Sequence, residues 1–311
     1  MSSHQPEPRI GVVGATGAVG TVTLEYLRER GYTDVRAFAS ARSTGKRLGD
    51  LTVEEATPEA LSAGDLDLCL FSVGTPTSRE LVPHAVRGGA VCVDKSSAYR
   101  LEPGIPLVVP EVNGERAREH DGILANPNCC AIPLTSALKP LHEEAGLARV
   151  RVATYQSVSG AGGRAMDRLR ATEPGDADLA MDWDFDGEEF EEESKLRAES
   201  RKILELPELP ISVSCMRVPV LIGHAESVWV ETEEPLEPER ARELLGAALT
   251  LDDFPTPGRA AGRDDILVGR IRRDPTAANG LAFLVVCDNL RKGAALNAIQ
   301  IAELVLQKVA V

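Results

Sequence analysis

The sequence predicts an α/β domain with a doubly wound parallel sheet, followed by an α+β domain built on a largely antiparallel sheet. The chain has 311 residues, a length typical of about two domains. In its first half, short apolar runs alternate with helical patterns, which is typical of a parallel sheet. After residue 145 the strand-like segments are longer and alternate apolar with polar residues, as in an antiparallel sheet.

The expected elements follow from the spacing of apolar residues. Residues 9–14 form a buried apolar run, and residues 18–31 carry a helical pattern that ends at Gly31. Further strands of the first domain are expected at 34–40, 66–74, 89–96, 105–112 and 121–128. Strands of the second domain are expected at 148–160, 211–220 and 226–234. Residues 289–310 predict a helix with an apolar stripe that packs back on the first domain.

The composition argues against several classes of function. The net charge of −14 disfavours nucleic acid, whose phosphates attract Lys and Arg, and leaves no basic patch for an anionic membrane. Residues 1–10 contain no apolar secretion signal, and no apolar run approaches membrane-spanning length. The six cysteines form no CxxC pair, and none lies at zinc-ligand spacing from a histidine. We therefore expect a soluble, cytoplasmic protein with no metal site and no disulfide framework.

A glycine-rich turn follows the first strand and opens the first helix. Its glycines are Gly11, Gly14, Gly17 and Gly20. In this context a glycine turn lets a pyrophosphate approach the helix N-terminus. The spacing is GxxGxxG and not GxGxxG, so a tight turn without a ligand is the alternative. The strand–turn–helix context favours a Rossmann-type dinucleotide site.

The end of the second strand indicates which dinucleotide to expect. An NAD site usually carries Asp or Glu there for the ribose 2′-hydroxyl, but this strand ends at Ser40. Arg42 and Ser43 follow, and a guanidinium beside a hydroxyl suits a 2′-phosphate. NADP is therefore the expected cofactor, with a solvated basic loop as the alternative.

Two adjacent cysteines, Cys129 and Cys130, lie between a predicted strand end and a predicted helix start. A thiol at a helix N-terminus feels the positive end of the dipole and becomes a better thiolate. Ligands of open α/β sheets also bind at the carboxyl ends of strands, so position favours Cys129 as a nucleophile. Cys130 would point about 100° further round a helix, so both cannot face one substrate atom. A buried structural pair is the alternative.

Several motifs together resemble the aspartate-semialdehyde dehydrogenase family. They are GATGAVG, SARSTGKRL, PLVVPEVN, NPNCCAIPL, TYQSVSGAGG, RVPVLIGHAESVWVET, VGRIRRD and CDNLRKGAALNAIQIAE, in the family's order and over nearly the whole chain. The resemblance implies a cytoplasmic, usually homodimeric enzyme. It would interconvert L-aspartate 4-semialdehyde and L-4-aspartyl phosphate with NADP and phosphate, on the way to lysine, methionine and threonine. We expect residues 1–129 with 289–311 to form the Rossmann-type NADP-binding domain, and residues 130–288 the catalytic and dimerisation domain.

The resemblance also implies roles for individual residues. Cys129 matches the nucleophile that forms a thioester, Gln156 the residue that orients it, and His224 the general acid/base. The implied substrate contacts are Arg217 for the α-carboxylate, Glu199 and Lys202 for the amino group and phosphate, and Arg100 and Asn128 for phosphate. The implied cofactor contacts are Gly14, Thr16, Gly17, Ala18, Val19, Ser40, Arg42, Ser43, Gly74, Gly160 and Asn289.

The sequence departs from the family in two places. Cys130 stands where the family usually has Ser or Thr, and a thiol is the weaker hydrogen-bond donor. The segment between SGAGG and ESRKIL is shorter and more acidic than usual, which leaves substrate fit and dimer contacts open.

This acidic segment formally matches a calcium-binding loop at Asp182, Asp184, Asp186, Gly187 and Glu193. We expect a solvated acidic face instead, because Glu189 stands where a hydrophobic residue is usual. Pro174 and Gly175 also interrupt the entering helix.

Two other functions stay open. One is a sister acyl-phosphate reductase such as the N-acetylglutamyl-phosphate enzyme, whose acylated substrate amine would not need a carboxylate at Glu199. The other is an NADP-binding, dehydrogenase-like subunit without turnover. The presence of Cys129, Gln156 and His224 argues against the second alternative.

Overall fold

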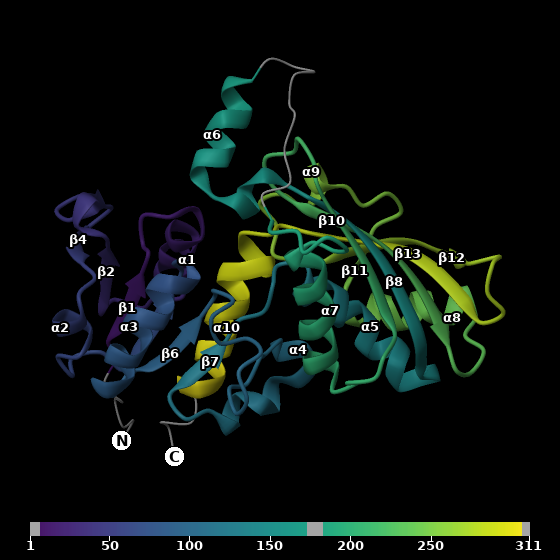
Figure 1. Ribbon diagram of the computed structural model, residues 1–311, viewed down its shortest axis with the longest axis horizontal. Coiled ribbons are helices and arrows are strands. Elements are labelled where there is room, and N and C mark those ends of the chain that lie inside the picture. Colours follow the sequence, from purple (N-terminus) through teal and green to yellow (C-terminus); the bar gives the residue numbers. More distant parts are fainter. Residues whose placement is uncertain (1–6, 173–182, 307–311) are drawn as a thin grey trace. The chain divides into compact units, whose positions relative to one another are not determined.

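The computed structural model describes residues 7–172 and 183–306. The chain divides into two compact units (Figure 1). The first comprises Met1–Pro127 and Ala294–Val311, and the second comprises Asn128–Gly293. Among the described residues, no helix is both long and apolar enough to cross a membrane.

The first unit contains a seven-stranded sheet in the order β3-β4-β2-β1-β5-β6-β7. Its neighbouring strands pair in parallel, apart from the antiparallel β3–β4 pair. The strands are β1 (Ile10–Val13), β2 (Val35–Ala39), β3 (Arg47–Leu48), β4 (Leu51–Glu55), β5 (Leu68–Phe71), β6 (Val91–Asp94) and β7 (Ile123–Ala125).

Helices cover both faces of this sheet. Val93 of β6 belongs to an apolar core shared with α1 (Ala18–Glu29) and α10 (Leu296–Leu306). The neighbouring Cys92 lies beside the Val82 carbonyl of α3 (Thr75–Arg87). Because successive strand residues point to opposite faces, α1 and α10 lie on one face and α3 on the other. The predicted doubly wound α/β fold is therefore confirmed.

The strand expected at 105–112 is wrong. Within this range Leu107 forms an isolated bridge to Ala125 of β7, and Pro110–Asn113 form the short helix α4. Pro106 and Pro110 explain the difference, because proline cannot donate to a strand ladder and fits the first turn of a helix. The helix expected at 289–310 also differs, since Arg291–Ala295 form a π-helical turn before α10. Residues 307–310 lie outside the described part of the chain.

The second unit contains a six-stranded sheet in the order β11-β12-β13-β10-β8-β9. It is largely antiparallel, as predicted, but β8 pairs in parallel with β9, and β11 with β12. The strands are β8 (Leu147–Gln156), β9 (Ile211–Arg217), β10 (His224–Thr232), β11 (Thr250–Leu251), β12 (Leu267–Arg273) and β13 (Gly280–Cys287). β8 is shorter than predicted, because the chain leaves the sheet after Gln156 and forms a 3-10 turn at Val158–Ala161.

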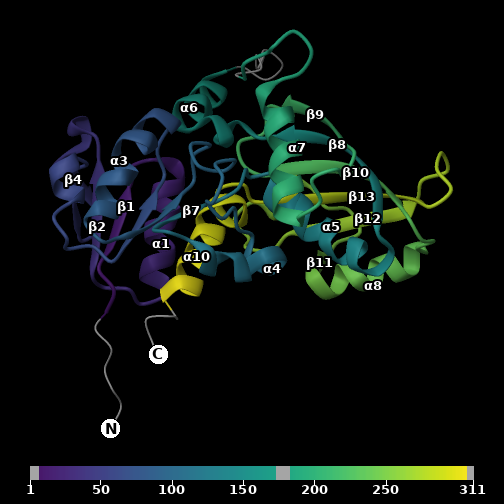
Figure 2. The same cartoon turned by 60° about the horizontal axis from the view of Figure 1, so that its bottom comes forward.

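Helices of the second unit pack against this sheet (Figure 2). They are α5 (Ala131–Ala145), α7 (Glu191–Leu204) and α8 (Pro238–Ala248), with α6 (Gly163–Ala171) and α9 (Pro257–Ala260) nearby in the chain. Burial alternates along β10: His224, Glu226 and Val228 are buried, and the residues between them are half-buried. One face of β10 is therefore covered and the other is more open to solvent.

Candidate active site

Three strand ends meet at one edge of the second sheet. Gln156 is the last residue of β8 and pairs with Arg217, the last residue of the parallel strand β9. β10 runs antiparallel to β8, so its first residue, His224, lies at the same edge. The parallel β8–β9 pair therefore brings together three residues that are far apart in the sequence.

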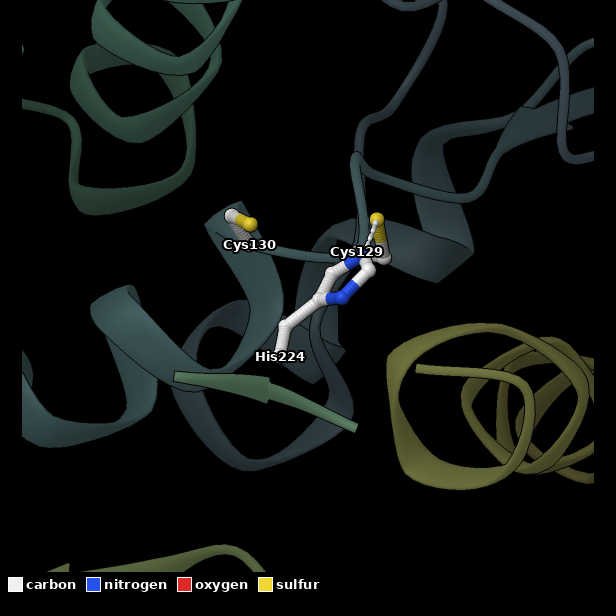
Figure 3. Close-up of side chains that lie close together, drawn as sticks. All are labelled: Cys129, Cys130 and His224. Carbon is white, nitrogen blue, oxygen red and sulfur yellow. Dashed lines mark hydrogen bonds between the residues drawn. The ribbon is translucent and has the colours of Figure 1, made fainter. Parts of the chain in front are cut away.

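Cys129 lies just before α5, with its sulfur at this edge. Its Sγ is 3.2 Å from Nε2 of His224 (Figure 3). Among the six cysteines it is partly exposed, whereas the other five are buried. A reagent could therefore approach the sulfur of Cys129, which already contacts an imidazole.

The hydrogen bond at Nδ1 of His224 determines which ring nitrogen carries the proton. The backbone N–H of Ser157 donates to Nδ1 at 3.0 Å. A backbone N–H can only donate, so Nδ1 accepts, and in the neutral ring Nε2 carries the proton. That Nε2–H points at the sulfur of Cys129. Asn289 supports this arrangement, because its Oδ1 accepts from Ser157 Oγ at 3.0 Å and from Gly223 N at 2.9 Å.

Cys130 is buried beside this pair: the sulfurs of both cysteines and a ring nitrogen of His224 lie within 4.8 Å of one another (Figure 3). It is 1% exposed, and its N–H donates to Oδ1 of Asn128 at 2.8 Å. Burial, together with the neighbouring Cys129, raises the pKa of the Cys130 thiol well above its ordinary value. The two cysteines therefore differ in environment. The environment of Cys129, which is partly exposed and contacts His224, is the one suited to a nucleophile.

Helix α7 contributes two buried carboxylates to the loop before Cys129. Glu199 accepts from the N–H of Asn128 at 2.6 Å. Glu192 accepts from the side-chain amides of both Asn128 and Gln156, each at 2.9 Å. Glu192 was not predicted from the sequence, because it lies in an acidic run that looks like a solvated surface. Lys202 lies three residues after Glu199, on the same side of α7, and is half-buried.

The expectation of a uniformly solvated acidic face is wrong for part of the segment. Glu192 and Glu193 are 9% and 8% exposed, because Glu192 bonds to the site and Glu193 accepts from Cys215 N and Phe190 N. Asp184 and Asp186 are exposed, and Asp186 accepts two backbone N–H groups of its own turn. Asp182, the first position of the calcium-loop pattern, lies outside the described residues.

Arg217 is held close to His224. Its Nη1 donates to the carbonyl of Ser157 at 3.0 Å. A Cβ atom on Gly160 would lie 3.1 Å from that Nη1 and 3.4 Å from Nε2 of His224. Glycine at 160 therefore keeps space open beside both the guanidinium and the imidazole.

Glu226 lies two residues after His224 on the buried face of β10. It is 1% exposed, and among the described residues no N–H or O–H group donates to either carboxyl oxygen. Burial, followed by the proximity of Cys129, raises the pKa of Glu226 well above its ordinary value. No pattern in the sequence distinguishes Glu226 from an ordinary solvent-exposed carboxylate.

The first unit contains the glycine turn and the residues expected around it. Gly14 has a φ of +87°, and a Cβ there would lie 2.3 Å from the carbonyl oxygen of Ser72. Gly17 is the N-cap of α1. Glycine has no side chain, so no side-chain hydrogen bond caps the N–H groups of the first turn. Thr16 and Gly17 are exposed, and Ala18 and Val19 are half-buried. This geometry fits the close approach of a pyrophosphate to a helix N-terminus.

The other expected ligand contacts of the first unit lie at strand ends. Ser40 and Arg42 are exposed after β2, and Ser43 is buried. Gly74 is the N-cap of α3. Arg100 is buried and donates to the carbonyls of Asn126 and Lys95, at 3.0 and 2.7 Å. Gly160 and Asn289 belong to the second unit, and their contact with a cofactor stays a prediction.

A doubly wound dinucleotide-type domain joined to a mixed α+β domain with a cysteine–histidine pair defines a dehydrogenase of the semialdehyde dehydrogenase class. The family model described as semialdehyde dehydrogenase, NAD binding domain, matches residues 9–120. The model described as semialdehyde dehydrogenase, dimerisation domain, matches residues 138–182 and 181–292.

Individual proteins narrow the class. Aspartate-semialdehyde dehydrogenase of Streptomyces akiyoshiensis is 46% identical over 333 residues, covering 96% of this chain and 98% of its own. That of Aquifex aeolicus is 41% identical, covering 96% and 98%. The structure of aspartate semialdehyde dehydrogenase II from Vibrio cholerae, complexed with ASA, has a TM-score of 0.91 at 37% identity, covering 97% and 99%. This chain belongs to the aspartate-semialdehyde dehydrogenase family.

The comparisons also bear on the acidic segment. The alignment with the Streptomyces enzyme spans 333 residues, more than the 311 of this chain, so the relative carries residues without a counterpart here. The dimerisation-domain match is broken at residues 181–182. The break falls inside the segment that looked short by sequence.

Replacing Glu226 by Gln should change how stability depends on pH. The pKa of Glu226 is raised in the folded protein, so above about pH 4.5 the folded state binds more protons than the unfolded state. The free energy of unfolding should therefore fall as pH rises, by up to about 1.4 kcal/mol per pH unit. Gln does not titrate, so Glu226→Gln should gain stability relative to the unmutated protein as the pH rises above about 4.5.

Urea unfolding across this pH range measures the difference. Glu231→Gln, on the same strand but half-buried, is the matched control for loss of a carboxylate. Parallel stability curves for Glu226→Gln and the unmutated protein would show that Glu226 ionises freely in the folded state.

Proposed function

We propose that this protein catalyses the NADP-dependent, reversible reductive dephosphorylation of L-4-aspartyl phosphate to L-aspartate 4-semialdehyde through a thioester on Cys129. The observation that carries the proposal is the 3.2 Å contact between Cys129 Sγ and His224 Nε2, in a chain of the aspartate-semialdehyde dehydrogenase family. The proposed setting is cytoplasmic biosynthesis of lysine, threonine and methionine.

Cys129 and His224 account for the covalent steps. The thiolate of Cys129, next to the N-terminus of α5 and the Nε2–H of His224, attacks the acyl carbon of aspartyl phosphate. Phosphate leaves with the electron pair of the broken C–O bond, and the thioester forms. NADPH, when bound, would supply the hydride that reduces this thioester. The Nε2–H of His224 would stabilise the tetrahedral oxyanion by a hydrogen bond. As the carbonyl of the aldehyde forms again, the C–S bond breaks and Cys129 leaves with its electron pair as the thiolate.

The remaining site residues would bind the substrate. A carboxylate can be held by the two parallel donors of Arg217, which fixes orientation as well as adding energy. Glu199 would accept from the α-ammonium in addition to its bond with Asn128, since a carboxylate offers lone pairs on two oxygens. Gln156, held by Glu192, would orient the thioester. The residues proposed to bind phosphate are Lys202, Arg100 and Asn128.

NADP is the proposed cofactor. No acidic residue stands at the end of β2, where Ala39 is followed by Ser40, and the exposed Arg42 lies next. Aspartate semialdehyde dehydrogenase from Candida albicans has been solved with NADP. The residues proposed to hold it are the expected cofactor contacts named above.

We also propose a homodimer formed through the open face of the six-stranded sheet. The second unit matches a family model described as a dimerisation domain. Tyr155 and Met216 on this sheet are 41% and 51% exposed, which is unusual for large apolar side chains. Trp229 and Arg151 line a hollow of about 390 Å³ on the same sheet.

The nucleophile can be tested by separating the two cysteines. Cys129→Ala should abolish phosphate-dependent reduction of NADP with aspartate semialdehyde, because no thioester can form. Cys130→Ser should keep most of the activity, since the Cys130 thiol is buried and its raised pKa favours the protonated form. Mass spectrometry with a thiol alkylator should find Cys129 labelled first. Labelling of Cys130 together with an active Cys129→Ala protein would refute the assignment.

Cofactor choice can be tested at Arg42. Loss of one charge-assisted contact costs about 1.5–3 kcal/mol. Arg42→Ala should therefore raise the Kd for NADP about 10- to 100-fold and leave the Kd for NAD unchanged. Arg47→Ala, an exposed basic residue of β3, is the matched control. Kd values for both cofactors measure the effect, and equal affinity of the unmutated protein for NAD and NADP would sink this assignment.

Substrate choice can be tested at Arg217. Arg217→Lys keeps the charge but loses the two-pronged donor, and kcat/KM for aspartate semialdehyde should fall about 10- to 100-fold. Arg272→Lys, exposed on β12, should have no effect. The unmutated protein should also prefer aspartate semialdehyde to N-acetylglutamate semialdehyde. The opposite preference would assign the protein to the sister acyl-phosphate reductases.

A further inference from the structure

We propose that Trp183 is a positioning residue for substrate recognition, which stacks on Arg217 and fixes the plane of its guanidinium. The inference rests on the proposed function, because it takes Arg217 as the residue that binds the α-carboxylate. It makes the short acidic segment a working part of the substrate site.

The contact itself is a cation–π stack. Cζ of Arg217 lies 4.6 Å from the ring centroid of Trp183, well inside the range of such interactions. Tryptophan is the strongest aromatic partner, and the interaction gains strength where the cation is desolvated. Arg217 is 9% exposed, so its surroundings favour the stack.

Stacking on a face is compatible with binding a carboxylate at an edge. The donors of a guanidinium lie in its plane, so a ring stacked on one face leaves the edge available for a carboxylate. Nη1 is fixed by its bond to the Ser157 carbonyl, and the indole limits rotation about that bond. The two contacts together define the direction in which the fork points.

Trp183 is itself held in place. Its ring meets Phe190 edge to face at 6.1 Å between centroids, and Phe185 packs on the same Phe190 at 5.2 Å. Phe190 precedes the first turn of α7, the helix that carries Glu192 and Glu199. The indole is therefore fixed to the helix that also fixes the loop before Cys129.

Further contacts close the turn between Trp183 and α7. Glu191 N donates to the Asp184 carbonyl at 2.8 Å. Arg197 pairs with both carboxyl oxygens of Glu189, at 2.7 and 2.5 Å. A segment with this many internal contacts is preorganised, so little conformational entropy remains to be lost when substrate binds.

The dimerisation-domain match breaks at residues 181–182, immediately before the tryptophan. The chain therefore places an aromatic ring over Arg217 from the first described residue after the break.

The test compares Trp183→Ala and Trp183→Phe with Phe185→Ala. Phe185 belongs to the same turn, is 58% exposed, and serves as the matched aromatic control. Trp183→Ala should raise the KM for aspartate semialdehyde about 2- to 30-fold with no change in the KM for NADP. Trp183→Phe should recover much of the loss, and Phe185→Ala should stay near the unmutated protein.

A substrate without the carboxylate distinguishes positioning from simple structural damage. For 3-aminopropanal, Trp183→Ala should equal the unmutated protein, because no carboxylate engages Arg217. In an Arg217→Lys background, Trp183→Ala should add little, since the stacked fork is already lost. Equal losses for both aldehydes, or equal losses in Trp183→Ala and Phe185→Ala, would overturn the proposal.

A spectroscopic arm separates this inference from the proposed function. In a Trp229→Phe background Trp183 is the sole tryptophan, because the chain has two. Arg217→Ala should change its fluorescence emission, whereas Arg272→Ala should not. Absence of turnover in the unmutated protein would refute the function alone, and an emission unchanged by Arg217→Ala would refute the stack.

Discussion

The backbone of Ser157 is the point on which the site depends. Its N–H sets the proton of His224 on Nε2, its carbonyl holds Nη1 of Arg217, and its hydroxyl bonds to Asn289. These groups are available because the chain leaves β8 after Gln156, so the Ser157 N–H is not used in the sheet. One residue therefore couples His224, the proposed general acid/base, to Arg217, the residue proposed to hold the substrate.

The local pattern of the sequence predicted much of the fold. Apolar runs and alternation located β1, β2, β5, β6, β8, β9 and β10 to within a few residues. Pattern alone cannot specify which distant strands pair, so the parallel β8–β9 pair was not foreseen. That pairing is what places Arg217 beside Gln156, since an antiparallel β9 would put Arg217 at the opposite edge. The strand expected at 105–112 failed because apolar content outweighed two prolines that cannot join a ladder.

The prediction of the site was limited in a different way. Motifs named Cys129, Gln156, His224 and Arg217, and the structure brings these four together. The buried carboxylates that hold the site residues could not be predicted from composition. Glu192 and Glu193 lie in the same acidic run as the exposed Asp184 and Asp186. The difference arises only in three dimensions: the helix start at Phe190 turns two of these carboxylates inward, where amides and backbone N–H groups satisfy them.

The buried groups around Cys129 complete this electrostatic arrangement. Burial raises the pKa of both Cys130 and Glu226, so both favour their neutral forms beside the sulfur. Two further anions there would oppose a thiolate in a medium of low dielectric constant. With these neighbours neutral, the positive end of α5 and the Nε2–H of His224 can stabilise a thiolate at Cys129. In the proposed mechanism the adjacent cysteines therefore have opposite tasks: Cys129 carries the charge as a thiolate, and Cys130 fills space without competing for it.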